Sequence, residues 1–216
     1  MNTVKPKYTH VLWDWNGTLL NDVGAALKSV NQMLERRGRT PITMAQYYEY
    51  IGIPIRKFYE NIFNLEQEDY AGILKEYNDG YENLRHETTL AKGAGDVLCH
   101  IHRSGLRQIV LSSCEQNQLN SYVAHYELQD YFDTVIGSQD FFAGSKVERA
   151  KRHLADNGID PKRVLVVGDL VHDYEMAREI GADCVLIPNG HQSAQQLASS
   201  GAKVLDTIMQ VPDELI

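Results

Sequence analysis

Short runs of apolar and β-branched residues recur along the chain, and they constrain its fold more than any other feature. Five strong runs and one weaker run occur, at residues 10–15, 107–113, 133–138, 163–169, 183–188 and 202–206. Each is almost continuously apolar, which is typical of parallel strands covered by helices on both faces. Strands that alternate with helices predict an α/β fold, a doubly wound parallel sheet with right-handed crossovers.

Helical patterns separate the later strands. Apolar residues share one helical face within 94–104 and within 145–157, and a third pattern over 171–181 ends at Gly181. Glycine suits the position just after a helix because it readily adopts left-handed backbone angles. We expect these helices to supply the crossovers between the strands.

The interval 20–88 breaks this rhythm, because no convincing strand appears in it. It contains an amphipathic helical series that ends near Gly38, followed by helical patterns over 43–50, 54–63 and 66–84. The pattern predicts two domains. Residues 1–19 and 89–216 would form an α/β core, and residues 20–88 would form a helical domain inserted between the first and second core strands.

Composition excludes several classes of function. No apolar run in the 216 residues approaches the roughly 20 residues of a membrane span, and the N-terminus lacks the apolar segment of a secretory signal. Three widely spaced cysteines without a CxxC pair suit reduced thiols, so we expect a cytoplasmic protein. The net charge of −8 argues against nucleic-acid binding but not against a small anionic substrate. Both a monomer and a homodimer are compatible with this composition.

Polar side chains follow the predicted strands where each strand ends. Open α/β sheets bind ligands at this edge, where the sequence places Asp14, Ser112, Ser113, Asp169 and Asp173, with Lys146 starting the helix after the third strand. Carboxylates this close repel one another, so a cation is expected among them, and hard oxygen ligands point to Mg²⁺. A metal, a lysine and a hydroxyl make a site for a phosphoryl group. Asp14 beside them can act as a nucleophile and form an aspartyl-phosphate.

Each of these residues also has a simpler structural explanation. An aspartate after a strand is usually a turn or capping residue, and the two serines could cap a helix that begins near Glu115. Lys146 could be a solvated helix residue, and Asp169 and Asp173 could be first-turn acids favoured by the helix dipole. The functional interpretation is favoured because all of these residues fall at strand ends on the same side of one sheet.

Four segments in order, "DWNGTL", "LSS", Lys146 and "GDLVHD", resemble the four motifs of the haloacid dehalogenase superfamily of hydrolases. The inserted helices look like the helical cap of its phosphoglycolate-phosphatase and β-phosphoglucomutase branch. "IGIPIRKFYE" is similar to a segment of that cap, and "YFDTVIGSQD" to the core segment before the motif lysine. The resemblance covers nearly the whole chain and implies a phosphatase with a Rossmann-like core.

The resemblance implies a role for each matching residue. Asp14 would be the nucleophile and a metal ligand, and Asn16 would offer its backbone carbonyl to Mg²⁺. Asp169 would complete the metal shell, with Asp173 beside it or ordering Lys146 or a water molecule.

The phosphoryl group would be held by a second set of residues. Ser112 would bond a phosphate oxygen, and Lys146 would neutralise the transferring group and the nucleophile. The other implied substrate-binding residues are Gly17, Thr18, Ser113 and, in the cap, Arg56 and Lys57. For the two cap residues, a solvated helix face is the simpler explanation.

The sequence departs from the family pattern at Asn16. The phosphatases have an aspartate at this position, which protonates the leaving oxygen and later activates water, and an amide can do neither. General acid–base catalysis typically contributes about 10²–10⁴-fold. Activity is therefore expected to be reduced but not abolished.

Four explanations of Asn16 compete. The substrate could have a good leaving group, such as an acyl phosphate, because phosphoryl transfer depends mostly on positioning and charge. His172 could replace the acid, although a solvent-facing residue is its simpler explanation. The protein could bind phosphate compounds without efficient turnover. Finally, the Asn16–Gly17 pair could deamidate and generate an aspartate.

Two related chemistries of the superfamily also lack the second aspartate. Dehalogenation is disfavoured because those enzymes use no metal, whereas Asp169 keeps the metal-ligand position. Phosphonoacetaldehyde hydrolase needs a cap lysine to form a Schiff base, and Lys57 or Lys28 would be the candidates, with a surface lysine as the alternative for both. The alternative functions are therefore C–P bond hydrolysis through a cap lysine and, from another class, phosphate binding without catalysis.

Overall fold

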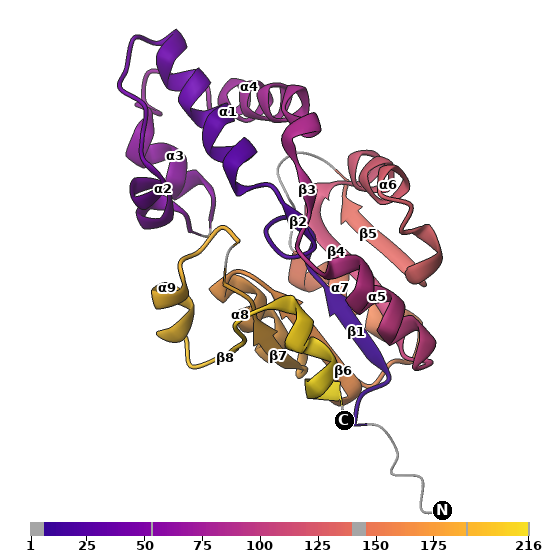
Figure 1. Ribbon diagram of the computed structural model, residues 1–216. Coiled ribbons are helices and arrows are strands. Elements are labelled where there is room, and N and C mark those ends of the chain that lie inside the picture. Colours follow the sequence, from indigo (N-terminus) through magenta and orange to yellow (C-terminus); the bar gives the residue numbers. More distant parts are fainter. Residues whose placement is uncertain (1–6, 53, 140–145, 189, 216) are drawn as a thin grey trace, which may run out of the picture. The chain divides into compact units, whose positions relative to one another are not determined.

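The computed structural model describes residues 7–52, 54–139, 146–188 and 190–215. The chain divides into two compact units (Figure 1). We call Met1–Leu20 with Leu90–Ile216 the core unit, and Asn21–Thr89 the cap unit.

Among the described residues, the core unit contains a six-stranded parallel sheet with the strand order β5-β4-β1-β6-β7-β8. The strands are β1 (His10–Trp13), β4 (Arg107–Glu115), β5 (Thr134–Ser138), β6 (Val164–Gly168), β7 (Asp183–Leu186) and β8 (Lys203–Val204). The chain moves outward from β1 in one direction through β4 and β5, then returns to β6 and continues to β8. The predicted α/β class, a doubly wound parallel sheet, is confirmed.

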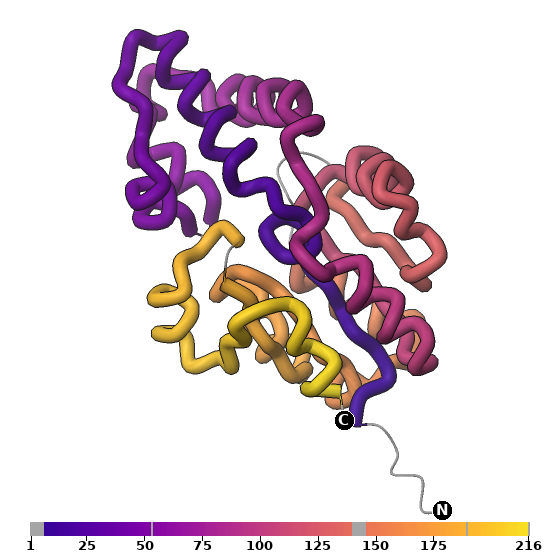
Figure 2. The backbone as a smooth tube through the Cα atoms, in the orientation of Figure 1, coloured from indigo at the N-terminus to yellow at the C-terminus, as the bar shows by residue number. Residues whose placement is uncertain are grey.

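Helices connect these strands and cover both faces of the sheet. Their bounds are α5 (Ala94–Arg103), α6 (Gln116–His125), α7 (Lys146–Asp156), α8 (Val171–Ile180) and α9 (Ala194–Ala198). Right-handed crossovers place α5 and α6 on one face and α7 and α8 on the other. The final 3₁₀ segment, η4 (Ile208–Leu215), packs against α5, so the end of the chain joins that face (Figure 2).

Strand β1 lies at the centre of the sheet, and its register decides where the polar strand-end residues lie. Trp13 is paired with Val110 of β4 on one side and with Val167 of β6 on the other. Since the three strands are parallel and in step, the residues just beyond these pairs lie at one edge of the sheet. Asp14, Ser112 and Asp169 follow the pairs by one or two residues.

The cap unit is helical. Its elements are α1 (Val23–Arg36), α2 (Met44–Tyr50), α3 (Arg56–Ile62), α4 (Tyr70–Asn83) and the 3₁₀ turn η1 (Arg85–Glu87). Helices α1 and α4 pack together, and a group of aromatic residues fills the unit, with Tyr47, Phe58, Tyr59 and Tyr81 buried. In the described part of the chain, no helix combines the length and apolar character needed to cross a membrane.

Two very short strands mark the ends of the inserted segment, and the hydrophobic pattern does not predict them. β2 (Leu20–Asn21) pairs with β3 (Thr89–Leu90), and the Ala91 N–H donates to the Leu19 carbonyl at 2.8 Å. Two residues are too few to produce an alternating pattern, which is why these strands cannot be recognised from the sequence. The boundaries between the two units fall inside these strands.

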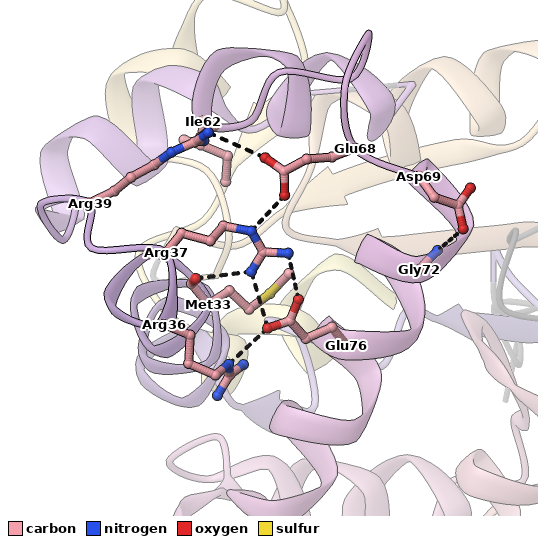
Figure 3. Close-up of polar contacts among 9 residues, drawn as sticks. All are labelled: Met33, Arg36, Arg37, Arg39, Ile62, Glu68, Asp69, Gly72 and Glu76. Carbon is pink, nitrogen blue, oxygen red and sulfur yellow. Dashed lines mark hydrogen bonds and ion pairs between the residues drawn. The ribbon is translucent and has the colours of Figure 1, made fainter.

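An arginine at the end of α1 ties the cap unit together (Figure 3). Arg37 donates from Nε to Glu68 at 2.6 Å and from Nη2 to Glu76 at 2.7 Å. Glu76 also accepts from Arg36 at 2.8 Å. These hydrogen bonds, with that of Arg37 foremost, lower the pKa of Glu76. The network joins the C-terminal end of α1 to α4 and to the turn before it.

Candidate active site

Lys146 brings two aspartates of the core unit together. Its ammonium group donates to Asp14 Oδ1 at 2.5 Å and to Asp173 Oδ1 at 2.6 Å, and all three side chains are buried. Burial acts to lower the pKa of Lys146, but the charges of Asp14 and Asp173 outweigh it and the pKa is raised. The lysine therefore stays protonated between the two carboxylates. Its explanation as a solvated helix residue is wrong.

Asp169 lies in the same group and is held by different partners. The Thr18 hydroxyl donates to Asp169 Oδ1 at 2.9 Å and is also 3.4 Å from Asp14 Oδ2. The backbone N–H of His191 donates to Asp169 Oδ2 at 2.6 Å. Burial raises the pKa of Asp169 well above its usual range, and the neighbouring carboxylates of Asp14 and Asp173 add to this effect. Thr18 thus contacts carboxylates in this group, in addition to any role toward phosphate.

The three carboxylates fit a hard divalent cation. Asp14, Asp169 and Asp173 each offer an oxygen atom within 4.8 Å of the others. Oxygen ligands of this kind are those that Mg²⁺ and Ca²⁺ prefer. Burial, despite the nearby charge of Lys146, also raises the pKa of Asp14. A cation among these groups would offset the cost of burying several negative charges against one lysine.

The turn after β1 presents its backbone next to this group. Gly17 has φ of +76°, and its N–H donates to the Leu20 carbonyl at 2.9 Å. A side chain at Gly17 would collide with the Asp169 carboxylate, so only glycine suits this position. The bridge between Asn16 and Leu20 uses the Trp15 carbonyl and the Gly17 N–H. The carbonyl of Asn16 itself takes no part in that bridge.

The two serines of the second motif differ in their surroundings. Ser112 is 1% exposed, and its hydroxyl accepts a hydrogen bond from the Cys114 N–H at 3.0 Å. Ser113 is exposed. Neither caps the following helix, because the Glu115 side chain does so by accepting from the N–H groups of Asn117 and Gln118. The helix-capping explanation of these serines is therefore wrong.

Asp173 partly fits its simpler explanation as a first-turn acid. Its Oδ2 accepts from the Leu170 N–H at 3.1 Å, which caps the start of α8, while its Oδ1 contacts Lys146. His172, next to it, is half-buried, with Nδ1 3.7 Å from Glu175 Oε2. The structure places His172 beside an exposed carboxylate on its own helix.

The cap residues lie in the other unit. Arg56 and Lys57 are exposed in the first turn of α3. Arg56 donates to Glu60 at 2.9 Å, and its guanidinium carbon is 5.0 Å from the centre of the Tyr70 ring. Lys28 is exposed and donates to Glu87 at 2.5 Å. Arg56 and Lys28 are therefore engaged by carboxylates within the cap unit.

Sequence reasoning missed three residues that shape the site. Gly168 and Gly190 leave room for carboxylates, since a side chain at either would collide with Asp173 or Asp169 respectively. The N–H of His191 holds Asp169. Gly190 and His191 follow β7, next to β6 in the sheet, so their position at a strand end was the available signal.

Comparisons with known proteins agree with this geometry. The family model of the haloacid dehalogenase-like hydrolases matches residues 11–187. A phosphoglycolate phosphatase of Pseudomonas fluorescens is 24% identical over 210 residues, covering 92% of this chain and 76% of the relative. A 5'-nucleotidase of Pseudomonas aeruginosa is 22% identical over 193 residues, covering 88% of this chain and 87% of the relative.

A solved structure shows the same fold. A crystal structure from Lactobacillus delbrueckii subsp. bulgaricus has a TM-score of 0.82 and 18% identity, and the match covers 97% of this chain and 99% of that one. The family match extends from β1, before Asp14, to the end of β7 and so contains all four motifs. The resemblance and the expectation of a hydrolase are confirmed. The chain belongs to the haloacid dehalogenase-like hydrolase family.

Proposed function

We propose that this protein is a Mg²⁺-dependent phosphatase that acts on a small phosphorylated metabolite through an aspartyl-phosphate on Asp14. One observation carries the proposal. The Lys146 ammonium is held between Asp14 and Asp173, with Asp169 in the same buried group. This is a nucleophile beside a fixed positive charge, at the sheet edge where α/β proteins bind ligands.

In the first half-reaction, an Asp14 oxygen attacks phosphorus in line as the bond to the leaving oxygen breaks. The leaving group departs as a carboxylate from an acyl phosphate, or takes a proton from water as an alcohol from an ester. Lys146, already in contact with Asp14, stabilises the negative charge of the transferring group. The Ser112 hydroxyl donates a hydrogen bond to a phosphate oxygen. A Mg²⁺ ion held by Asp14, Asp169, Asp173 and the Asn16 carbonyl would supply further positive charge at the phosphate. In the second half-reaction, water cleaves the acyl phosphate, releasing inorganic phosphate and restoring the Asp14 carboxylate.

Asn16 determines which substrates react fastest. Its amide N–H groups are too weakly acidic to protonate the leaving oxygen, so esters with poor leaving groups lose the roughly 10²–10⁴-fold contribution of a general acid. Acyl phosphates and other good leaving groups need little protonation. We therefore expect the protein to favour such substrates, or to be a slow enzyme with ordinary phosphate esters.

The relatives suggest where a substrate search should begin. They include a phosphoglycolate phosphatase and a 5'-nucleotidase, so small phosphate monoesters of both kinds belong in the first panel. The three cysteines, Cys99, Cys114 and Cys184, are free thiols. This is compatible with a reducing compartment, and we place the protein in the cytoplasm on that basis.

No observation in the described residues favours C–P bond hydrolysis. That chemistry needs a cap lysine whose amine is made nucleophilic by burial or by a neighbouring cation. Lys57 is exposed, and Lys28 is exposed and paired with Glu87.

The proposal is tested by measuring phosphate release with Mg²⁺ from a panel of phosphomonoesters, nucleotides and acyl phosphates. Activity that is lost on chelation and restored by Mg²⁺, together with trapping of phosphate on Asp14, is the expected result. Release of no phosphate from any member of the panel would contradict the proposal. Retained phosphate binding would then favour a non-catalytic binding protein.

Replacing Asn16 by aspartate separates the explanations of this residue. If the missing acid is the only defect, Asn16→Asp should raise turnover of alkyl phosphates by about 10²–10⁴-fold and change acyl-phosphate turnover little. If the wild type is active and Asn16→Asp does not raise its turnover, either the substrate needs no acid or His172 supplies the proton. His172→Gln, measured beside it, distinguishes these two outcomes.

A further inference from the structure

The end of β4 departs from the regular sheet just where Ser112 lies. The ladder to β5 pairs Leu111 with Ile136 and then Glu115 with Ser138, so more residues of β4 than of β5 fill the interval. Such a bulge disrupts ladder hydrogen bonds and lets the strand turn its side chains to new directions. A serine placed here needs other contacts to fix its position.

An arginine of helix α7 makes one of these contacts. Arg149 Nη2 donates to the backbone carbonyl of Ser112 at 2.8 Å. Arg149 lies on α7, three residues after Lys146, so the helix that supplies the lysine of the catalytic group also supplies this donor.

Ser112 is thereby held at two points. Its carbonyl accepts from Arg149, and its Oγ accepts from the Cys114 N–H at 3.0 Å. A hydroxyl that accepts one hydrogen bond still has its own proton to donate. With the peptide fixed on one side and Oγ on the other, that proton has a restricted direction. Such a fixed donor costs no reorganisation when negative charge develops on a phosphate oxygen.

We propose that Arg149 is a positioning residue, which fixes the Ser112 carbonyl and so orients the Ser112 hydroxyl toward the phosphoryl group. The inference rests on the proposed phosphatase function, to which it adds a residue outside the four motifs. Arg149 acts through Ser112 and not through direct contact with phosphate. The proposal predicts that replacing Arg149 lowers activity and phosphate affinity only while the Ser112 hydroxyl is present.

A double-mutant cycle tests this coupling. Arg149→Met and Ser112→Ala are made singly and together, and kcat/KM and the affinity for inorganic phosphate are measured for each. Loss of a hydrogen bond from a charged donor is expected to lower both quantities about tenfold in Arg149→Met. The double variant should match Ser112→Ala alone, because the hydroxyl that Arg149 orients is already absent. If Arg149→Met lowers kcat/KM and phosphate affinity by the same factor in the wild type and in Ser112→Ala, the proposal is overturned.

The surroundings of Arg149 provide a control and a rescue. Arg149 borders a cavity of about 470 Å³ that Arg152 and His153 of the same helix also line. Arg152→Met removes the same charge from the same helix and should change neither quantity. Because the cavity is open to solvent, added guanidinium should restore activity to Arg149→Ala but not to the double variant Arg149→Ala, Ser112→Ala. Rescue in both would also overturn the proposal.

Two further measurements distinguish a variant that does not fold, a failure of the proposed phosphatase function and a failure of the Arg149 proposal. Thermal unfolding of each variant identifies any that does not fold, and Arg149→Lys, which keeps one donor, then replaces Arg149→Met in the cycle. A wild type that hydrolyses no ester contradicts the proposed function, and the cycle is then decided on phosphate affinity. A wild type that also binds no phosphate contradicts both proposals.

Discussion

Lys146, the first described residue of α7, donates a hydrogen bond of 2.5 Å to Asp14, the residue that follows the central strand β1. The two residues are 132 positions apart in the chain, and they meet because parallel strands and right-handed crossovers return every connection to the same edge of the sheet. Both side chains are buried, so their charges act on each other with little screening by water.

Removing this lysine should destabilise the protein most when no metal is present. Lys146→Met leaves Asp14 and Asp173 buried without their cation, and breaking a buried pair costs about 3–5 kcal/mol. We expect a lower free energy of unfolding in chelator, a larger stabilisation by Mg²⁺ than in the wild type, and a fall in kcat of at least about 10²-fold. Urea denaturation with and without Mg²⁺ measures the first two. Lys151→Met, which removes an exposed lysine of the same helix, is the matched control and should change stability by less than about 1 kcal/mol.

Asp169→Asn should remove metal binding without reducing the folding stability of the metal-free protein. An amide in this position can still accept from the His191 N–H and can donate to Thr18, so both hydrogen bonds of the carboxylate are replaced. Since burial raises the pKa of Asp169, its charge destabilises the metal-free protein. The variant should therefore be at least as stable as the wild type in chelator, but should lose the rise in Tm that Mg²⁺ gives the wild type. A Mg²⁺-dependent rise of unchanged size would show that Asp169 does not bind the metal.

The sheet and the four strand-end motifs could be predicted from the sequence because each depends on local pattern and chain order. A nearly continuous apolar run such as 163–169 identifies a buried strand, and its polar end residue must lie at the carboxyl edge. This reasoning placed Asp14, Lys146, Asp169 and Asp173 at one edge, and the structure brings their side chains together.

The remaining features depend on contacts that no local pattern records. The bond from Arg149 to the Ser112 carbonyl joins a side chain to the backbone of a distant strand, and an arginine on a charged helix face gives no sign of it. The position of Gly190 after a strand places it at the site edge, but the close approach of Asp169 that requires a glycine there is not readable from the sequence. Strands β2 and β3 are missed for another reason, because a strand of two residues is shorter than the period needed to detect it.

The cap unit should lose stability in acid through one carboxylate. Hydrogen bonds from Arg37 lower the pKa of Glu76, so its ionised form stabilises the folded cap above about pH 4.3, the ordinary pKa of a glutamate. That contribution is lost as the pH falls through the lowered pKa of the folded state. Glu76→Gln should be less stable than the wild type at pH 7, and the difference should shrink toward pH 3. Thermal unfolding at several pH values measures this. Glu66→Gln, an exposed glutamate of the same unit, should show no such convergence.

Asn16 should resist deamidation in the folded protein although it precedes a glycine. The reaction requires the Gly17 backbone nitrogen to attack the Asn16 side chain, and this N–H is engaged with the Leu20 carbonyl at 2.9 Å, in a turn flanked by buried Asp14 and Thr18. Asn157–Gly158 is an internal reference that differs mainly in burial. Both of its residues are exposed after α7, and its Gly158 N–H also donates, to the Ala155 carbonyl at 3.1 Å. Peptide mapping by mass spectrometry after prolonged incubation should find Asn16 converting more slowly than Asn157 in native protein, and at a similar rate in urea. Equal deamidation rates of Asn16 and Asn157 in the folded protein would show that the fold does not protect Asn16. The phosphatase activity of the wild type would then have to be corrected for the fraction of Asn16 that is converted to aspartate on storage.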